Sequence, residues 1–279
     1  MTYAAEISRA NPTCFLFLID QSASMKEPIG GGDVPMQKAE AVADAINRLL
    51  SELSIKCAKE DGVRDYFHVG VIGYGSSVGP IFEGALAGRD LVPLSEVAAT
   101  PARLEERVRP IGSRGGSKAN QPIKFPTWFS ATAYGDTPMS AALTRARDVM
   151  STWLAQHPGS FPPIVLNVSD GESTDGDPSI AAEGLKGLTS TDGNVLLFNL
   201  HLSSDLSDPI VFPNAEDPLP DTYAKMLFRM SSSLPDDMRK AAQRQDLALG
   251  DGSKGFAFNA DISSIVQFLD VGTQVMDLR

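Results

Sequence analysis

The most continuous apolar run in the chain extends from Cys14 to Ile19 and ends abruptly in Asp20. Apolar residues without alternation are typical of a central strand in a parallel sheet that is covered on both faces. A second apolar-rich stretch, Ile164 to Ser169, likewise ends in a carboxylate, Asp170. Because open α/β sheets bind ligands at the carboxyl edge of their strands, we expect both aspartates at one functional edge.

The remaining hydrophobic pattern predicts alternating strands and helices. Apolar residues at spacings of three and four indicate an amphipathic helix from Met36 to about Lys59 that packs on the sheet. Further strands are expected at Tyr66–Tyr74, Val78–Phe82, Val195–Leu202 and Phe256–Phe258, a β-ribbon at Ile123–Ser130, and helices at Pro101–Val108, after Pro138, and at Pro178–Leu188, Asp221–Met230 and Ile262–Met276. The pattern predicts an α/β fold: a doubly wound, mostly parallel six-stranded sheet with one antiparallel edge strand and helices on both faces.

The residues after the first strand form a short oxygen-rich motif, Asp20, Ser22 and Ser24. Their spacing of two places the three side chains on one side of an extended segment, and a tight loop brings them together. One carboxylate and two hydroxyls suit a hard cation such as Mg2+, which takes oxygen ligands and keeps open or water-filled positions. A helix cap is the competing interpretation, since Ser and Asp are common at caps and turns.

A third loop adds a further hydroxyl. Thr137 precedes Pro138 at the predicted first turn of a helix, so its side chain lies in the loop before that helix. Three loops of a parallel sheet thus supply five oxygen-bearing side chains to one edge: Asp20, Ser22, Ser24, Thr137 and Asp170.

These three motifs, in this order, resemble the von Willebrand factor A family, whose metal-ion-dependent adhesion site is matched residue by residue by the same five positions. The resemblance covers nearly the whole chain. It implies a Rossmann-like fold and a divalent cation, Mg2+ by default with Mn2+ or Ca2+ as alternatives. It also implies that the hydroxyls are direct ligands, that either aspartate acts directly or through water, and that an acidic side chain of another protein completes the coordination.

A softer resemblance concerns the C-terminal third. The stretches MSSSLPDDMRKAA and GFAFNAD are similar to bacterial cytoplasmic members of the family, including those of tellurite-resistance and stress-response systems. We expect the surface around Met25, Met139 and Glu172 to determine which partner fits. The acids Glu172, Asp175 and Asp177 do not have the spacing of an EF-hand and are interpreted as an acidic rim.

The composition is typical of a soluble globular protein and argues against some classes of partner. The 279 residues are 42% hydrophobic and 21% charged, and we expect an N-terminal extension over residues 1–12 and one domain over residues 13–279 with an insertion at about 84–130. The 24 Lys and Arg residues against 35 Asp and Glu give a net charge of -11, which argues against non-specific binding to nucleic acid or anionic membranes. No particular oligomeric state is predicted.

The N-terminus and the lack of a long apolar stretch indicate a cytoplasmic location. Cys14 lies in a predicted strand and Cys57 in a predicted helix, so we expect buried, reduced thiols instead of a disulfide or a zinc site. The N-terminal segment lacks the apolar region of a secretion signal, and no stretch reaches the roughly 18 apolar residues of a membrane span.

Two other classes of function compete with a binding module. A haloacid-dehalogenase-like, magnesium-dependent phosphatase also places an aspartate after its first strand, but it usually has a second aspartate two positions later, where this chain has Ser22. No well-placed lysine is expected beside Asp170, and His68, His157 and His201 suggest no catalytic triad. We therefore predict that the chain is not an enzyme, with a structural subunit carrying an unmetallated site as the remaining alternative.

Overall fold

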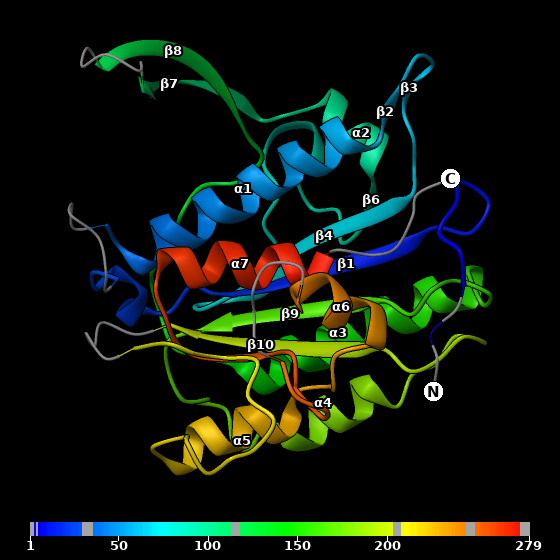
Figure 1. The fold of residues 1–279 in the computed structure, drawn as a ribbon, viewed down its shortest axis with the longest axis vertical. Coiled ribbons are helices and arrows are strands. Elements are labelled where there is room, and N and C mark those ends of the chain that lie inside the picture. Colours follow the sequence, from blue (N-terminus) through cyan, green and yellow to red (C-terminus); the bar gives the residue numbers. More distant parts are fainter. Residues whose placement is uncertain are drawn as a thin grey trace.

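A mostly parallel β-sheet runs through the middle of the molecule (Figure 1). The computed structural model describes residues 3, 5–29, 36–112, 118–202, 208–243 and 249–273. The parallel strands are β1 (Thr13–Asp20), β4 (Phe67–Tyr74), β9 (Ile164–Ser169), β10 (Leu196–Leu202) and β12 (Phe256–Ala260). The antiparallel strands are β5 (Val78–Pro80), β6 (Val92–Pro93) and β11 (Ile210–Val211). The strand order is β11-β12-β10-β9-β1-β4-β5, with β6 also paired to β4.

The predicted fold class is confirmed, but the predicted number of strands is wrong. The sheet has eight strands where six were expected, and antiparallel strands lie at both edges. The two additional strands, β6 and β11, contain only two residues each. A two-residue strand is too short to leave a periodic hydrophobic signal in the sequence.

Helices cover both faces of this sheet. They are α1 (Lys38–Lys56), α2 (Leu94–Ala99), α3 (Met139–Gln156), α4 (Ser179–Lys186), α5 (Thr222–Met230), α6 (Asp236–Gln243) and α7 (Ile262–Thr273). Side chains of α1, α2, α6 and α7 belong to one hydrophobic core and those of α3, α4 and α5 to the other. The arrangement is that of a doubly wound α/β fold.

Strand β1 explains why its sequence shows no alternation. Phe15, Phe17 and Ile19 pack into the core beneath α1, while Leu16 and Leu18 pack into the core beneath α3. Every residue of the strand is buried, because successive side chains point to opposite faces and both faces are covered. The strand therefore holds its last residue, Asp20, in a fixed position at the carboxyl edge.

The segment predicted as a helix at Pro101–Val108 is instead part of a β-hairpin, so this prediction is wrong. Strand β7 (Arg103–Gly112) pairs in antiparallel register with β8 (Lys118–Thr127), and the pair projects beyond α1 at the top of Figure 1. Its Arg, Leu and Glu residues suit a helix, but intrinsic propensity is a weak preference that pairing with a partner strand overrides. The predicted β-ribbon at Ile123–Ser130 largely coincides with β8.

A buried asparagine fastens the base of this hairpin to α1. The side-chain amide of Asn47 donates to the carbonyl of Phe129 at 3.1 Å, and its oxygen accepts from the backbone N–H of Trp128 at 2.8 Å. Asn47 is almost fully buried, so these bonds replace water for otherwise unpaired groups. The domain limits at residues 13–279 and the insertion at about 84–130 stay a prediction.

Buried polar side chains also connect the central strands beneath the carboxyl edge. The Tyr74 hydroxyl donates to Asn167 Oδ1 at 2.8 Å, and Asn167 Nδ2 donates to Asn199 Oδ1 at 3.0 Å. Asn199 in turn donates to the hydroxyl of Ser231 at 2.9 Å. A fully satisfied buried network of this kind favours one arrangement of the strand ends that carry the site.

Two smaller predictions can be compared with the structure. Cys14 and Cys57 are both buried and free, as expected of reduced thiols. Among the helices of the described residues, none has the length and apolar character needed to cross a membrane.

Candidate metal centre

Four of the five predicted ligand residues meet at the carboxyl edge of the sheet. Asp20 is the last residue of β1, and Asp170 directly follows β9, the strand paired with β1. Ser22 and Ser24 lie in the turn after β1, where a short 3-10 helix (η1, Ala23–Lys26) begins. Ser22 is the residue before this helix; its backbone is extended, and its side chain makes no capping bond.

Asp20 is fixed by two hydrogen bonds and is fully buried. Its Oδ1 accepts from the backbone N–H of Ser22 at 2.8 Å, and its Oδ2 accepts from the hydroxyl of Ser169 at 2.7 Å. Burial raises the pKa of the Asp20 carboxyl, the bonds from Ser169 and Ser22 oppose this shift, and the nearby charge of Asp170 adds to it. Ser169 is not among the predicted site residues, although its place before Asp170 at the end of a buried strand is a usable signal.

Ser22, Ser24 and Asp170 form a continuous hydrogen-bonded chain. The Ser24 hydroxyl donates to Asp170 Oδ1 at 2.7 Å, and the hydroxyls of Ser22 and Ser24 are 3.0 Å apart. Since the Ser24 proton points to Asp170, Ser22 is the donor in the bond between the two serines. Residues 146 positions apart in the sequence are thus in direct contact, as the motif spacing predicted.

The expectation that no lysine accompanies Asp170 is wrong. Lys38, the first residue of α1, places its Nζ 2.8 Å from Asp170 Oδ2 and 2.9 Å from Glu27 Oε2. Lys38 is only 3% exposed. The sequence could indicate that Lys38 is buried, because it lies four residues before Val42 and eight before Ile46 on the buried stripe of α1, but not that Asp170 is its partner.

Thr137 lies beside this network, but among the described residues no hydrogen bond joins it to Asp20, Ser22, Ser24 or Asp170. Its backbone N–H donates to the Thr174 hydroxyl at 3.0 Å, and its carbonyl accepts from the N–H of Thr174 at 2.9 Å. Its Oγ1 is 3.8 Å from the position that a Cβ on Gly171 would take, so the hydroxyl adjoins the loop that carries Asp170. Backbone bonds therefore hold Thr137 at the edge while its hydroxyl remains available.

The donor set fits a hard divalent cation. Two carboxylates balance a charge of +2, and three hydroxyls are neutral oxygen ligands of the type that Mg2+ accepts. As a donor to Ser24, the Ser22 hydroxyl keeps both lone pairs free for a cation. In the part of the chain that the structure describes, no group of three or more His, Cys, Asp or Glu side chains is placed to hold a metal.

Tyr223 and His201 lie beside the loop that carries Asp170, on the side of β10. The Tyr223 hydroxyl donates to the carbonyl of Gly171. His201 stacks on Phe258 with ring centroids 4.8 Å apart, and burial lowers the pKa of His201 to about 4. At neutral pH His201 is therefore uncharged and adds no positive charge near Asp170.

The prediction that Met25 and Met139 belong to the surface that selects a partner is wrong. Met25 and Met139 are fully buried and belong to the two cores, so neither can face a partner. Met139 also accepts a weak bond from Asn167 Nδ2 at 3.7 Å. Both methionines adjoin the motifs in sequence, but the 3-10 helix η1 turns Met25 inward and helix α3 does the same for Met139.

Two of the three acids in the predicted acidic rim cap helices. Asp175 accepts from the N–H groups of Ser140 and Ala141 at the start of α3, at 3.0 and 2.8 Å. Burial tends to raise the pKa of Asp175, but these bonds and one from Ser173 lower it overall. Asp177 accepts from the N–H of Ser179 at 2.9 Å. The segment after Asp170 thus holds the starts of α3 and α4, while Glu172, Asp175 and Asp177 are all exposed, as an acidic rim requires.

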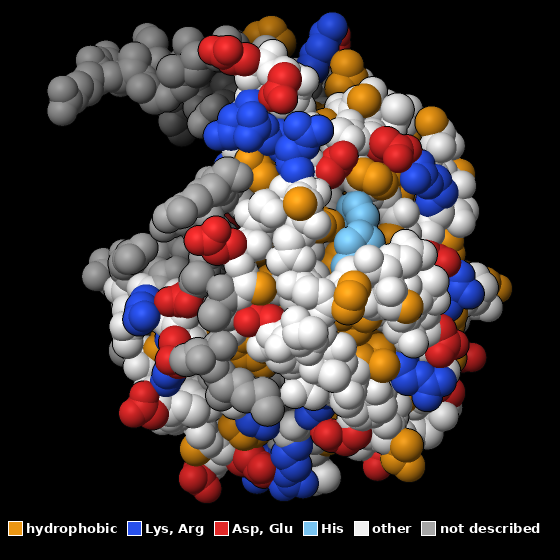
Figure 2. Space-filling model, turned by 90° about the vertical axis from the view of Figure 1, so that its right-hand side faces the viewer, with side chains coloured by type: hydrophobic (Ala, Val, Ile, Leu, Met, Phe, Trp, Pro, Cys, Tyr) orange, Lys and Arg blue, Asp and Glu red, His pale blue; other side chains and the backbone are white. Residues whose placement is uncertain are grey.

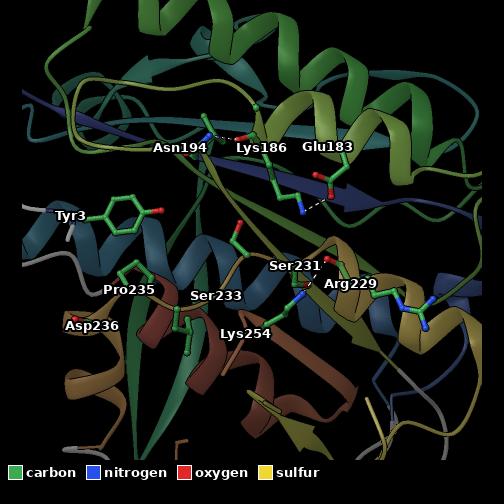
Figure 3. Close-up of a pocket in the computed structure, with 14 residues that line it drawn as sticks. Tyr3, Glu183, Lys186, Asn194, Arg229, Ser231, Ser233, Pro235, Asp236 and Lys254 are labelled. Carbon is green, nitrogen blue, oxygen red and sulfur yellow. Dashed lines mark hydrogen bonds and ion pairs between the residues drawn. The ribbon is translucent and has the colours of Figure 1, made fainter. Parts of the chain in front are cut away.

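A pocket of about 680 Å3 lies at the opposite edge of the sheet, near residues that precede β10 and β12 (Figure 3). Its basic groups are already engaged. Lys254 donates to the carbonyls of Phe228 and Arg229 at 3.1 and 3.2 Å, and Lys186 pairs with Glu183 at 2.7 Å. This pocket is separate from the candidate metal centre.

His68 also behaves as expected, as a hydrogen-bonded histidine. Its Nδ1 accepts from the indole N–H of Trp153 at 2.6 Å, and His157 stacks on the same indole. Acidic and basic side chains are interspersed over the face shown in Figure 2.

Comparison with known proteins gives a limited result. The chain matches no protein-family model and no curated protein sequence. Solved structures similar to it include a von Willebrand factor type A protein from Catenulispora acidiphila, with 13% identity and a TM-score of 0.48 over 95% of this chain and 42% of that one. Proximal thread matrix protein 1 from the mussel byssus, with a zinc-occupied MIDAS motif, has 12% identity and a TM-score of 0.47 over 96% of this chain and 48% of that one.

The vWF domain of the type V pili tip protein Mfa5 from Porphyromonas gingivalis shows 15% identity and a TM-score of 0.33 over 58% of this chain and 39% of that one. The chain therefore spans less than half the length of each of these proteins. The α/β fold described above rests on the chain's own sheet topology, and the function has to be argued from the site itself.

Proposed function

We propose that the chain is a metal-dependent protein-binding module of the von Willebrand factor A type. In this proposal Asp20, Ser22, Ser24, Thr137 and Asp170 hold a divalent cation, Mg2+ by default, and an acidic side chain of a partner protein completes its coordination. The observation that carries the proposal is the hydrogen-bonded convergence of Asp20, Ser22 and Ser24 with Asp170, contributed by two separate loops.

The roles of the residues follow from their charge and anchoring. Asp20 and Asp170 supply the two negative charges, and Ser169 and the N–H of Ser22 keep Asp20 oriented. Ser22, Ser24 and Thr137 supply neutral lone pairs, so the set does not over-neutralise a cation. A bound divalent cation supplies an electrophilic position for an incoming carboxylate, and a chain of net charge -11 otherwise repels acidic surfaces.

Thr137 offers the sharpest test of partner binding, because its backbone bonds to Thr174 persist when the hydroxyl is removed. Wild type and Thr137→Ala are used as bait in a cytosolic extract, with Mg2+ or with a chelator. We expect a partner that is retained by wild type with Mg2+, released by chelator, and bound by Thr137→Ala about 30-fold more weakly, the equivalent of losing an interface hot spot of about 2 kcal/mol.

The matched control is Thr152→Ala, which removes an exposed hydroxyl on α3 that bonds only the carbonyl of Asp148. This variant should capture the partner as wild type does. Partner capture that is unchanged by both chelation and Thr137→Ala would mean that the metal is not part of the interface.

We also propose that the chain has no hydrolytic activity. The residue two positions after Asp20 is Ser22, which cannot act as the acid that a phosphatase of the haloacid-dehalogenase type places there. The expected result is no turnover of p-nitrophenyl phosphate with Mg2+ above that of an Asp20→Asn control. Magnesium-dependent turnover that is lost in Asp20→Asn would overturn this part of the proposal.

The cellular setting we propose is a bacterial cytoplasmic complex of the stress-response or tellurite-resistance type. Its support is the resemblance of the C-terminal segments, Met230 to Ala242 and Gly255 to Asp261, to such family members.

A further inference from the structure

A buried ammonium group beside the candidate metal centre has no role in the function proposed above. Lys38 is 3% exposed, and its position at the first turn of α1 sets its positive charge against the positive end of the helix dipole. Burying a charge is costly unless it is paired and hydrogen-bonded. Both circumstances disfavour a lysine, so its presence calls for a specific partner.

That partner is Asp170. The side chain of Asp170 has no solvent exposure, and its Oδ2 is 2.8 Å from Lys38 Nζ. Its Oδ1 accepts the proton of Ser24 at 2.7 Å. Both oxygens of the carboxylate are therefore engaged, one by the serine chain and the other by a full positive charge. Glu27, whose side chain is 59% exposed, receives the second bond from Lys38 at 2.9 Å.

We propose that Lys38 is the counter-cation of Asp170 and that it competes with a divalent cation for the negative charge of this carboxylate. The inference rests on the metal site of the proposed function. Lys38 stabilises the metal-free arrangement of the site, because it keeps a buried carboxylate from being an uncompensated charge. For the same reason it weakens metal binding, since an ammonium and a divalent cation on one carboxylate repel each other.

The exposed position of Glu27 gives Lys38 an alternative acceptor. The ammonium already touches both carboxylates, so it can shift toward Glu27 without losing all of its ionic contacts. Metal affinity is thereby set by a competition within the chain.

Titration calorimetry with MgCl2 on wild type, Lys38→Met and Lys38→Arg tests this inference. Lys38→Met keeps the length of an unbranched side chain and removes the charge, so we expect its Mg2+ dissociation constant to fall at least tenfold. Lys38→Arg retains the charge and should stay within about threefold of wild type. Lys38→Gln, which is neutral and still polar, serves as a second variant if the methionine variant does not fold, and it should also bind Mg2+ more tightly.

Thermal unfolding provides a second measurement. Without metal, Lys38→Met should unfold at a lower temperature than wild type, and saturating Mg2+ should raise its midpoint more than it raises that of wild type. If wild type binds Mg2+ and neither neutral variant binds it more tightly, Lys38 is a structural ion-pair partner only and the inference is wrong.

The outcomes also separate this inference from the proposed function. Mg2+ binding by Lys38→Met but not by wild type would support the inference strongly, because Lys38 would then block the site of the wild-type protein. Absence of binding by wild type and by both neutral variants would overturn the metal site itself, and the inference with it.

Discussion

Asp20→Asn is expected to abolish detectable Mg2+ binding in titration calorimetry. The substitution keeps the shape of the side chain and removes one of only two negative charges that offset the cation. Changing a group that only hydrogen-bonds to a metal ligand lowers metal affinity roughly 10–100-fold. Removing the charge of the ligand itself should lower the affinity further. Because Asn retains an oxygen that can accept from the N–H of Ser22, the turn after β1 should keep its course.

The matched control is Asp177→Asn, a neutralised acid on the same side of the sheet that caps α4 through the N–H of Ser179. Asn caps a helix as well as Asp does, so this variant should bind Mg2+ with the heat and affinity of wild type. Equal binding heats for wild type and Asp20→Asn would remove Asp20 from the ligand set.

Gly135→Ala is expected to destabilise the fold by about 3 to 5 kcal/mol, the sum of a strained backbone and an overpacked contact. Gly135 has a φ of +99°, and a Cβ placed on it would lie 2.4 Å from the backbone nitrogen of Ser76. Its carbonyl also accepts from the N–H of Ala23 at 3.0 Å, which connects the Thr137 loop to the turn carrying Ser22 and Ser24. Urea unfolding at equilibrium measures the loss.

Gly176→Ala separates the two contributions. Gly176 has nearly the same backbone angle, +102°, but nothing lies within 4 Å of a Cβ placed there. Strain alone should then cost about 1–2 kcal/mol. If both variants lost the same stability, the close approach of Gly135 to Ser76 would have no energetic weight. The variant Gly135→Ala should also bind Mg2+ more weakly, since the shifted loop moves the serine turn.

The sequence was most informative where one local feature determines the structure. The unbroken apolar run before Asp20 predicted a central strand because burial on both faces requires apolar residues at every position. The acids and hydroxyls at the strand ends were predicted to meet because parallel strands end at one edge. Asp20, Ser22, Ser24 and Asp170 do meet there.

Features that depend on distant contacts were predicted poorly. The charged segment at Arg103 suits a helix by itself, and only its pairing with β8 makes it a strand. Met25 and Met139 follow or flank the motifs in sequence, yet both point into the cores. Sequence proximity to a motif does not determine which way a side chain faces.

Lys38 was missed for a related reason. Periodicity treats a lysine on the buried stripe of α1 as an interruption, whereas the structure supplies the carboxylates that make its burial possible. The acceptor Asp170 lies 132 residues further along the chain, so no local pattern can reveal the pair.

The most direct test of the metal-dependent binding site is an anomalous difference map from crystals grown with MnCl2. The proposed site requires one strong peak at the carboxyl edge of β1 and β9, about 2.1 Å from the hydroxyl oxygens of Ser22 and Ser24, with Lys38 Nζ further from Asp170 Oδ2 than the present 2.8 Å. A map without a peak at this edge at saturating Mn2+, with Lys38 still bound to Asp170, would contradict it.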